Sequence, residues 1–177
     1  MHTFAFFVRM YVLVFGIDEV RYFMKILGIR TSTQEIRYAI LDFQQDGSVK
    51  LLNDASENRL KFPASHDIIE KKLWWFYQEL ERIVRQNQPI EKIMIKPSEY
   101  GGRDSIASRT ASYIEGVVYT YAGKVGIPIE AKAYRAMKTC RVKVKIFAES
   151  NVSQTTINWN VQMADAVAVA FVGGIKK

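Results

Sequence analysis

Residues 25–42 constrain the fold of this chain more than any other segment. They read KILGIRTSTQEIRYAILD: a short apolar run, a polar turn rich in Ser and Thr, and a second run that begins by alternating polar and apolar residues. This pattern predicts two antiparallel strands joined by a tight turn, with the first strand buried. Functional residues of α/β sheets commonly lie where a buried strand ends. The residue at that position here is Arg30.

The composition indicates a globular domain with a core of its own. The chain has 177 residues, of which 49% are hydrophobic and 24% are charged, and a chain of this length and balance can bury a sizeable core. Its single cysteine, Cys140, excludes an internal disulfide and a cysteine-based zinc cluster. A reducing compartment suits such a chain, so we expect a cytoplasmic protein. Two histidines are too few for a histidine-based metal site.

Residues 1–23 differ from the rest of the chain. Their apolar run, 4–16, is interrupted by Arg9 and is too short to span a bilayer, so we expect no integral membrane segment. Three interpretations stay open: a mis-assigned start codon with the domain beginning at Met24, an added strand or helix, or a membrane-surface anchor. We therefore divide the chain into an N-terminal extension, 1–23, and a domain, 24–177.

The remaining apolar patterns predict an α/β fold. The expected elements are a third strand at 49–52, a long helix at 65–88, a strand at 90–96, a second long helix at 105–126, a strand at 127–131, a short helix at 134–140, an edge strand or basic loop at 142–146, and a last helix that starts at Asn158 or Asn160. An antiparallel meander followed by strand–helix–strand crossovers predicts one mixed five-stranded sheet, with helices on both faces and the first strand at its centre.

Aromatic residues on the two long helices suggest an interface. Trp74 and Trp75 lie off the apolar stripe of the first long helix, and an exposed tryptophan pair favours association. We therefore expect a homodimer formed through a long helix. The apolar stripe that we expect on the second long helix consists of Ile106, Thr110, Tyr113, Val117, Tyr121 and Val125.

Basic residues are concentrated near the end of the predicted sheet. The net charge is +7, which by itself says little about partners. Six cations without an intervening acid lie at 132–145, and such a segment could either neutralise phosphates or form a solvated basic face. The residues expected to contact nucleic acid are these six and one in the preceding glycine loop: Arg103, Lys132, Arg135, Lys138, Arg141, Lys143 and Lys145.

Four short strings follow one another in a recognisable order. They are ILGI at 26–29 with YAI at 38–40, IMIK at 93–96 before a helix, GIPIE at 126–130, and MADAVAVA at 163–170. In this order they resemble the RuvC-type Holliday-junction resolvases of the ribonuclease H-like superfamily, over residues 24–174. The resemblance implies a ribonuclease H-like sheet and binding to branched or structured nucleic acid.

The resemblance also implies a site, but with altered residues. The family uses four carboxylates to hold two Mg²⁺ ions that activate water. The matching positions here are Arg30, Lys96, Gln162 and Asp165, which include a single carboxylate. Arg30 and Lys96 would repel Mg²⁺, and each could pair with Asp165 or point to solvent. Glu99, three residues after Lys96, could rebuild a metal site if its loop turned into the cleft.

Three functions follow from these observations. The leading interpretation is a non-catalytic, RuvC-like protein without a metal or other cofactor, whose cation-filled cleft binds nucleic acid, regardless of sequence, or a protein partner. The second is an active Mg²⁺-dependent endonuclease or Holliday-junction resolvase with a relocated metal site. The third is an oligomeric protein-interaction module. The two cations at carboxylate positions favour a protein that is not an enzyme.

Overall fold

The computed structural model describes residues 24–99 and 105–175, so that the N-terminal extension and Arg103 lie outside it. The described elements are β1 (Met24–Thr31), β2 (Glu35–Phe43), β3 (Val49–Leu51), β4 (Arg59–Lys61), α2 (Ile69–Gln86), β5 (Lys92–Lys96), α3 (Ile106–Val125), β6 (Ile129–Ala131), α4 (Val144–Asn151) and α5 (Val161–Gly174). None of the helices in these ranges is long and apolar enough to cross a membrane.

The strands form one mixed sheet in the order β3-β2-β1-β5-β6, with β4 paired to β2 outside this path. β1 pairs antiparallel with β2 and parallel with β5, which confirms its predicted central place. The sixth strand, β4, was not predicted from the sequence. It is three residues long, and Leu60 is its one buried residue, so it carries no alternating pattern.

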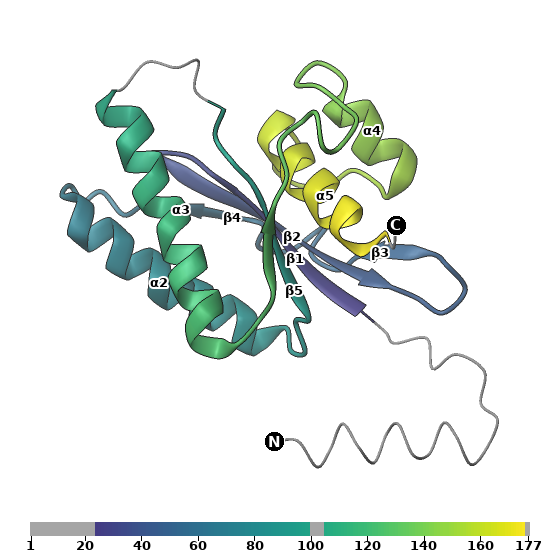
Figure 1. Cartoon of the computed structure of the whole chain (residues 1–177), viewed down its shortest axis with the longest axis horizontal. Helices are drawn as coiled ribbons and strands as arrows, with labels where there is room; N and C mark the ends of the chain where they lie inside the picture. The colour runs from purple at the N-terminus through teal and green to yellow at the C-terminus, as the bar shows by residue number, and fades with distance from the viewer. Residues whose placement is uncertain (1–23, 100–104, 176–177) are drawn as a thin grey trace, which may run out of the picture.

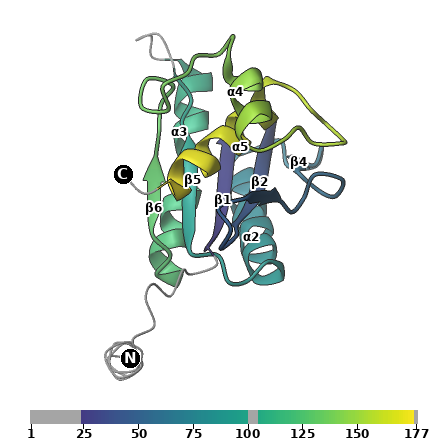
Figure 2. The ribbon, with the colours of Figure 1, turned by 90° about the vertical axis from the view of Figure 1, so that its right-hand side faces the viewer.

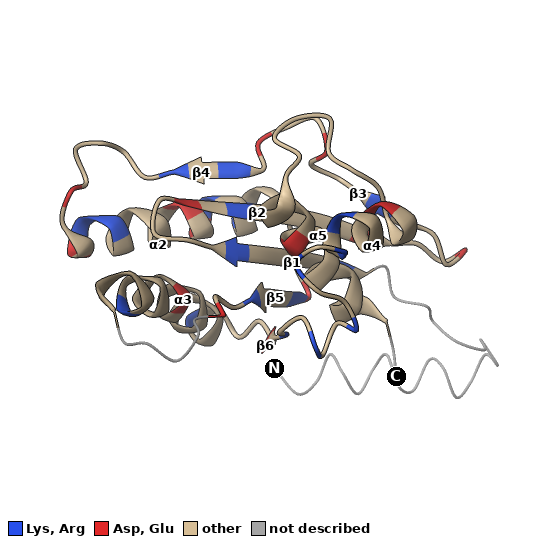
Figure 3. Ribbon diagram, turned by 90° about the horizontal axis from the view of Figure 1, so that it is seen from above, with Lys and Arg blue, Asp and Glu red and all other residues tan. Residues whose placement is uncertain are grey.

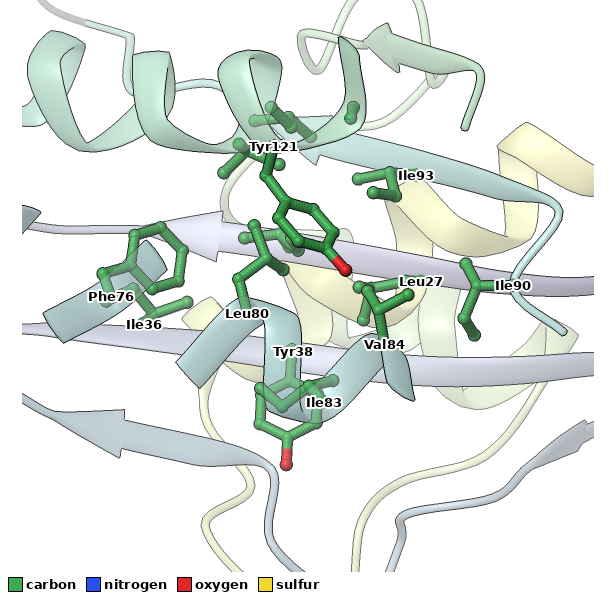
Figure 4. Packing of buried hydrophobic residues seen from close by; sticks show 14 of the residues in the cluster. Leu27, Ile36, Tyr38, Phe76, Leu80, Ile83, Val84, Ile90, Ile93 and Tyr121 are labelled. Atoms are coloured by element: carbon green, nitrogen blue, oxygen red, sulfur yellow. The ribbon is translucent and has the colours of Figure 1, made fainter. Parts of the chain in front are cut away.

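Helices cover both faces of the sheet, as predicted. α2 and α3 lie on one side and α4 and α5 on the other (Figures 1 and 2). On the first side, Leu27 of β1 packs in a core cluster with Leu80 of α2 and Tyr121 of α3 (Figure 4). On the second side, Ile26 and Met94 pack in a cluster that includes most of α5. Neighbouring residues of β1 are thus buried on opposite faces, which explains its almost unbroken apolar run.

α5 packs unusually close to β1. A side chain at Gly28 would collide with the carbonyl oxygen of Ala166 and with the side chain of Ala170, so glycine is needed there. The side chain of Asn160 caps the helix by accepting a hydrogen bond from the backbone N–H of Met163, as the predicted start of the last helix requires. This close contact sets the position of every α5 side chain relative to the end of β1.

Residues 134–146 differ from the prediction. Residues 134–138 form turns in place of the short helix expected at 134–140, and α4 replaces the edge strand or basic loop expected at 142–146. Val144 and Ala148 are fully buried, whereas Val142 and Ile146 are exposed. The burial therefore follows the spacing of a helix, and the alternation of valine, isoleucine and lysine was misleading.

The stripe predicted for α3 is only partly right: Tyr121 is buried and Val117 packs against the core, and the ends of the helix are as expected. Ser105 caps the helix and Gly126 ends it in the left-handed conformation, with φ of 74°. Ile106 and Tyr113, however, are 86% and 53% exposed. The buried residues include two alanines, whose weak hydrophobic signal concealed the true face; they are Ala111, Ile114, Val118, Tyr121 and Ala122.

Candidate functional site

The two cations of the predicted site lie side by side at the ends of parallel strands. Arg30 of β1 is in register with Lys96 of β5, and Figure 3 shows these two strands side by side. α5 brings Gln162 and Asp165 to the same place. These residues line one cavity of about 310 Å³ together with Glu99, Tyr134, Arg141 and Val161. The four positions that the resemblance implied therefore do meet in space.

Arg30 pairs with Asp165. Its Nε atom lies 3.2 Å from Asp165 Oδ2, and the aspartate side chain is only 2% exposed. Nε makes no hydrogen bond within the described residues, so the attraction is Coulombic. The guanidinium is oriented from its other end, because Nη1 donates hydrogen bonds to the Lys96 carbonyl at 3.3 Å and to Ser98 Oγ at 2.9 Å.

Lys96 pairs with Glu99 rather than with Asp165. Its side chain is 1% exposed, and Nζ donates hydrogen bonds to Glu99 Oε1 at 2.8 Å and to the Pro97 carbonyl at 2.9 Å. The same ammonium lies 3.9 Å from the centroid of the Tyr134 ring, in a cation–π contact. The loop after β5 does therefore turn its glutamate into the cavity, where the glutamate balances a buried lysine.

Tyr134 connects the two ion pairs and was missed in the sequence. Its hydroxyl donates a hydrogen bond to Asp165 Oδ1 at 2.8 Å, and its backbone N–H donates to Glu99 Oε1 at 3.0 Å. A lone tyrosine within a basic segment carries no signal of this role. Glu115 of α3 was also missed: it accepts hydrogen bonds from the backbone N–H of Ser98 at 2.8 Å and from Thr31 Oγ1 at 3.3 Å, and so holds the loop beside Arg30.

The ionisation of the cavity follows from these contacts. Burial raises the pKa of Asp165, and the Tyr134 hydrogen bond and the charges of Arg30 and Lys96 oppose that rise without cancelling it. Burial also acts to raise the pKa of Glu99, but the hydrogen bonds from Lys96 and from the Tyr134 backbone outweigh it, and the pKa is lowered. Burial and the contact with Asp165 raise the pKa of Tyr134, which keeps its hydroxyl protonated as a donor.

These residues do not suit the pair of Mg²⁺ ions that the resemblance implies. Two adjacent divalent cations need several acidic oxygens around them. The cavity holds two carboxylates, Asp165 and Glu99, and each already faces a cation of the protein. Within residues 24–99 and 105–175, no cluster of three or more His, Cys, Asp or Glu side chains could hold a metal ion.

The basic segment 132–145 runs from the end of β6 into α4, and Figure 3 shows its blue bands. Arg141 lines the cavity itself. Arg135, Lys138 and Lys143 are exposed. The other two are engaged within the protein, since Lys132 pairs with Glu130 and the Lys145 ammonium lies 6.0 Å from the centroid of the Trp159 ring.

The chain has a RuvC-like fold of the ribonuclease H-like type. RuvC of Thermus thermophilus in complex with a Holliday junction substrate superposes with a TM-score of 0.69, at 14% identity over 84% of this chain and 92% of that chain. A second structure of Thermus thermophilus RuvC gives 0.68 with the same identity and coverage. The yeast mitochondrial Holliday junction resolvase Ydc2 gives 0.58, at 16% identity over 88% of this chain and 79% of that chain.

Sequence comparison adds no relative to these structures. No family model matches the chain, and no curated protein sequence is significantly similar to it. At 14–16% identity, the structural similarity establishes the fold alone.

Proposed function

We propose that this protein is a non-catalytic, RuvC-like protein that binds structured or branched nucleic acid through its cation-filled cleft. The observation that carries the proposal is the placement of Arg30 and Lys96 at adjacent ends of parallel strands, with Asp165 paired to Arg30. Protein cations balance the acids of the cleft, so the cleft needs no metal ion. The RuvC-like fold supports nucleic acid as the partner, because RuvC and Ydc2 are Holliday junction proteins.

The charges of the cleft suit a phosphate backbone. Arg30, Lys96 and Arg141 outnumber Asp165 and Glu99 in the cavity. Further cations are exposed next to it, at Arg135, Lys138 and Lys143. Contacts of this kind position a backbone without reading bases, so binding should depend on the shape of the nucleic acid and on salt, and not on sequence. We place the protein in the cytoplasm, in keeping with its single cysteine, Cys140.

A binding and cleavage assay tests this function. Fluorescence anisotropy would compare a four-way DNA junction with linear duplexes made of the same arm sequences, and then with a junction of unrelated sequence. We expect both junctions to bind alike and more tightly than the duplexes, with no cleavage in Mg²⁺. Equal affinity for junction and duplex would contradict shape selection, and Mg²⁺-dependent cutting would contradict a non-catalytic cleft.

One observation favours the active nuclease as a second candidate. Glu99 shares the cavity with Asp165, as a relocated metal site would require. In that case Glu99→Gln and Asp165→Asn should each abolish Mg²⁺-dependent cleavage while leaving junction binding intact. If the wild-type protein does not cut DNA, the nuclease candidate is excluded and the binding function stands.

A groove between α2 and α3 supports a third role, association of two copies. It has a volume of about 580 Å³, and Trp74 and Tyr113 in its lining are 62% and 53% exposed. Trp75, in contrast, packs against Phe62 with ring centroids 5.5 Å apart, so it belongs to the protomer core. We propose that Trp74 is the buried residue of a homodimer. Light scattering should then show a dimer that Trp74→Ala converts to monomer, and a monomeric wild-type protein at high micromolar concentration would contradict this.

A further inference from the structure

A second cavity lies on the side of the sheet that α4 and α5 cover. Its volume is about 540 Å³, and it shares no lining residue with the cavity of Arg30 and Asp165. Met137, Phe147 and Phe171 provide apolar lining, and the two phenylalanine rings meet edge to face with centroids 6.1 Å apart. The size and the aromatic lining are typical of sites that enclose a small molecule.

The polar lining of this cavity carries a surplus of positive charge. Three lysines contribute to it, Lys92, Lys132 and Lys138, together with one carboxylate, Glu130. Lys92 Nζ lies 2.9 Å from Glu130 Oε2, and Lys132 pairs with the other oxygen of the same carboxylate. Glu130 is thus shared by two partly buried lysines. Lys138 is exposed and forms no ion pair within the described residues.

We propose that this cavity binds a small molecule that combines a flat, apolar ring system with one carboxylate or phosphate group. The rings of Phe147 and Phe171 and the side chain of Met137 would contact the ring system, since aromatic and thioether groups pack well against aromatic faces. The anionic group would lie at the lysines, with Lys138 as the cation that no carboxylate of the described protein neutralises. A charge-assisted hydrogen bond there would orient the ligand. The proposal does not rest on nucleic-acid binding, although Lys138 also belongs to the basic segment 132–145.

A titration with two matched probes tests the proposal. Naphthalene-1-carboxylate carries the ring and the anion, and naphthalene-1-carboxamide has the same shape without the charge. NMR of protein labelled with ¹³C in its methionine methyl groups would follow Met137, assigned by Met137→Leu. We expect the Met137 signal to shift saturably with the carboxylate and to require a several-fold higher concentration of the amide. A Met137 signal that neither probe moves would overturn the proposal.

Substitutions at the cavity separate its shape from its charge. Ala136 is an exposed lining residue, so Ala136→Trp should occupy the cavity without disturbing the core and should abolish binding of both probes. Lys138→Glu should weaken binding of the carboxylate probe by about fivefold or less, as expected for an exposed charge. It should leave binding of the amide probe unchanged. The matched control is Lys143→Glu, because Lys143 is exposed on the same segment but does not line the cavity.

The control also decides between a site and a general field. An equal loss of carboxylate binding in Lys143→Glu and Lys138→Glu would mean that positive charge alone attracts the probe, and would overturn the proposal. The signal of Met163, which is buried but does not line the cavity, reports whether each variant is folded.

Discussion

Arg30 Nε of β1 lies 3.2 Å from Asp165 Oδ2 of α5, and the aspartate is almost completely buried. The pair joins the centre of the sheet to the helix that covers it. Burying a carboxylate is costly unless a cation accompanies it, and at this position the protein supplies its own. The charge balance of the cleft is therefore part of the stability of the fold, and it can be tested by removing either charge.

Removing the acid should destabilise the protein. Asp165→Ala leaves Arg30 without its partner and the Tyr134 hydroxyl without its acceptor. We expect the free energy of unfolding to fall by about 3 kcal/mol. Urea unfolding measures it. Asp165→Asn keeps an acceptor for Tyr134 but loses the charge. Its free energy of unfolding should therefore lie between those of the wild-type protein and Asp165→Ala. A loss no greater than that of Asp67→Ala, a control at a residue whose side chain is 76% exposed, would show that the pair contributes nothing.

Glu99 should make the stability depend on pH in the acid range. Because the pKa of Glu99 is lowered in the folded protein from its ordinary 4.5, its contribution is present above pH 4.5 and is lost as the pH falls through the folded pKa. The free energy of unfolding of the wild-type protein should exceed that of Glu99→Gln by up to about 1 kcal/mol at neutral pH. The difference is small because the side chain is partly exposed. This difference should shrink below pH 4.5 in chemical unfolding experiments.

A second glutamate provides a control of opposite sign. Burial raises the pKa of Glu91, so its contribution is present below the ordinary 4.5 and is lost as the pH rises through the folded pKa. The stability of Glu91→Gln relative to the wild-type protein should therefore rise towards neutral pH, whereas that of Glu99→Gln should fall. Parallel pH profiles of the two variants would contradict the assignment.

The basic segment should determine how nucleic-acid binding responds to salt. If three of its cations contact phosphates, the slope of log affinity against log salt should be about −2 to −3. Replacing Lys138, Arg141 and Lys143 together by Gln should flatten this slope. The control replaces three exposed lysines elsewhere, Lys50, Lys61 and Lys71. Binding that persists unchanged in the first triple variant would exclude the segment from the interface.

Restoring acids should create a metal site. The variant Arg30→Asp, Lys96→Glu, Gln162→Asp would place carboxylates at all four positions that the resemblance implies, Asp165 included, in addition to Glu99 in the same cavity. Their mutual repulsion should destabilise the protein in the absence of metal, and Mg²⁺ should restore about 2.7 kcal/mol at a hundred times its dissociation constant. Thermal unfolding with and without Mg²⁺ measures this. The same variant with Asp165→Asn should be stabilised less by Mg²⁺. If Mg²⁺ stabilised the wild-type protein as much as the triple variant, the charge argument would be contradicted.

Much of the fold could be predicted because local chemistry specifies it. The buried run around Ile26 and the turn after it mark a central strand, the side chain of Ser105 starts α3, and Gly126 ends it in a conformation that glycine adopts readily. The meeting of Arg30, Lys96, Gln162 and Asp165 in one cavity was also anticipated, through the resemblance and not through spacing.

Tertiary packing decided the rest. Val142, Val144 and Ile146 alternate as in a strand, but the contacts of Val144 and Ala148 with α5 and its neighbours select a helix. Which acid neutralises Arg30 depends on segments far apart in the chain. Arg30 meets Asp165, and Tyr134 meets Asp165 and Glu99, only once β1, α5 and the segment after β6 are assembled. Periodicity reports which face of a segment is buried, whereas the partner of a buried charge is determined by the distances that the assembled fold imposes.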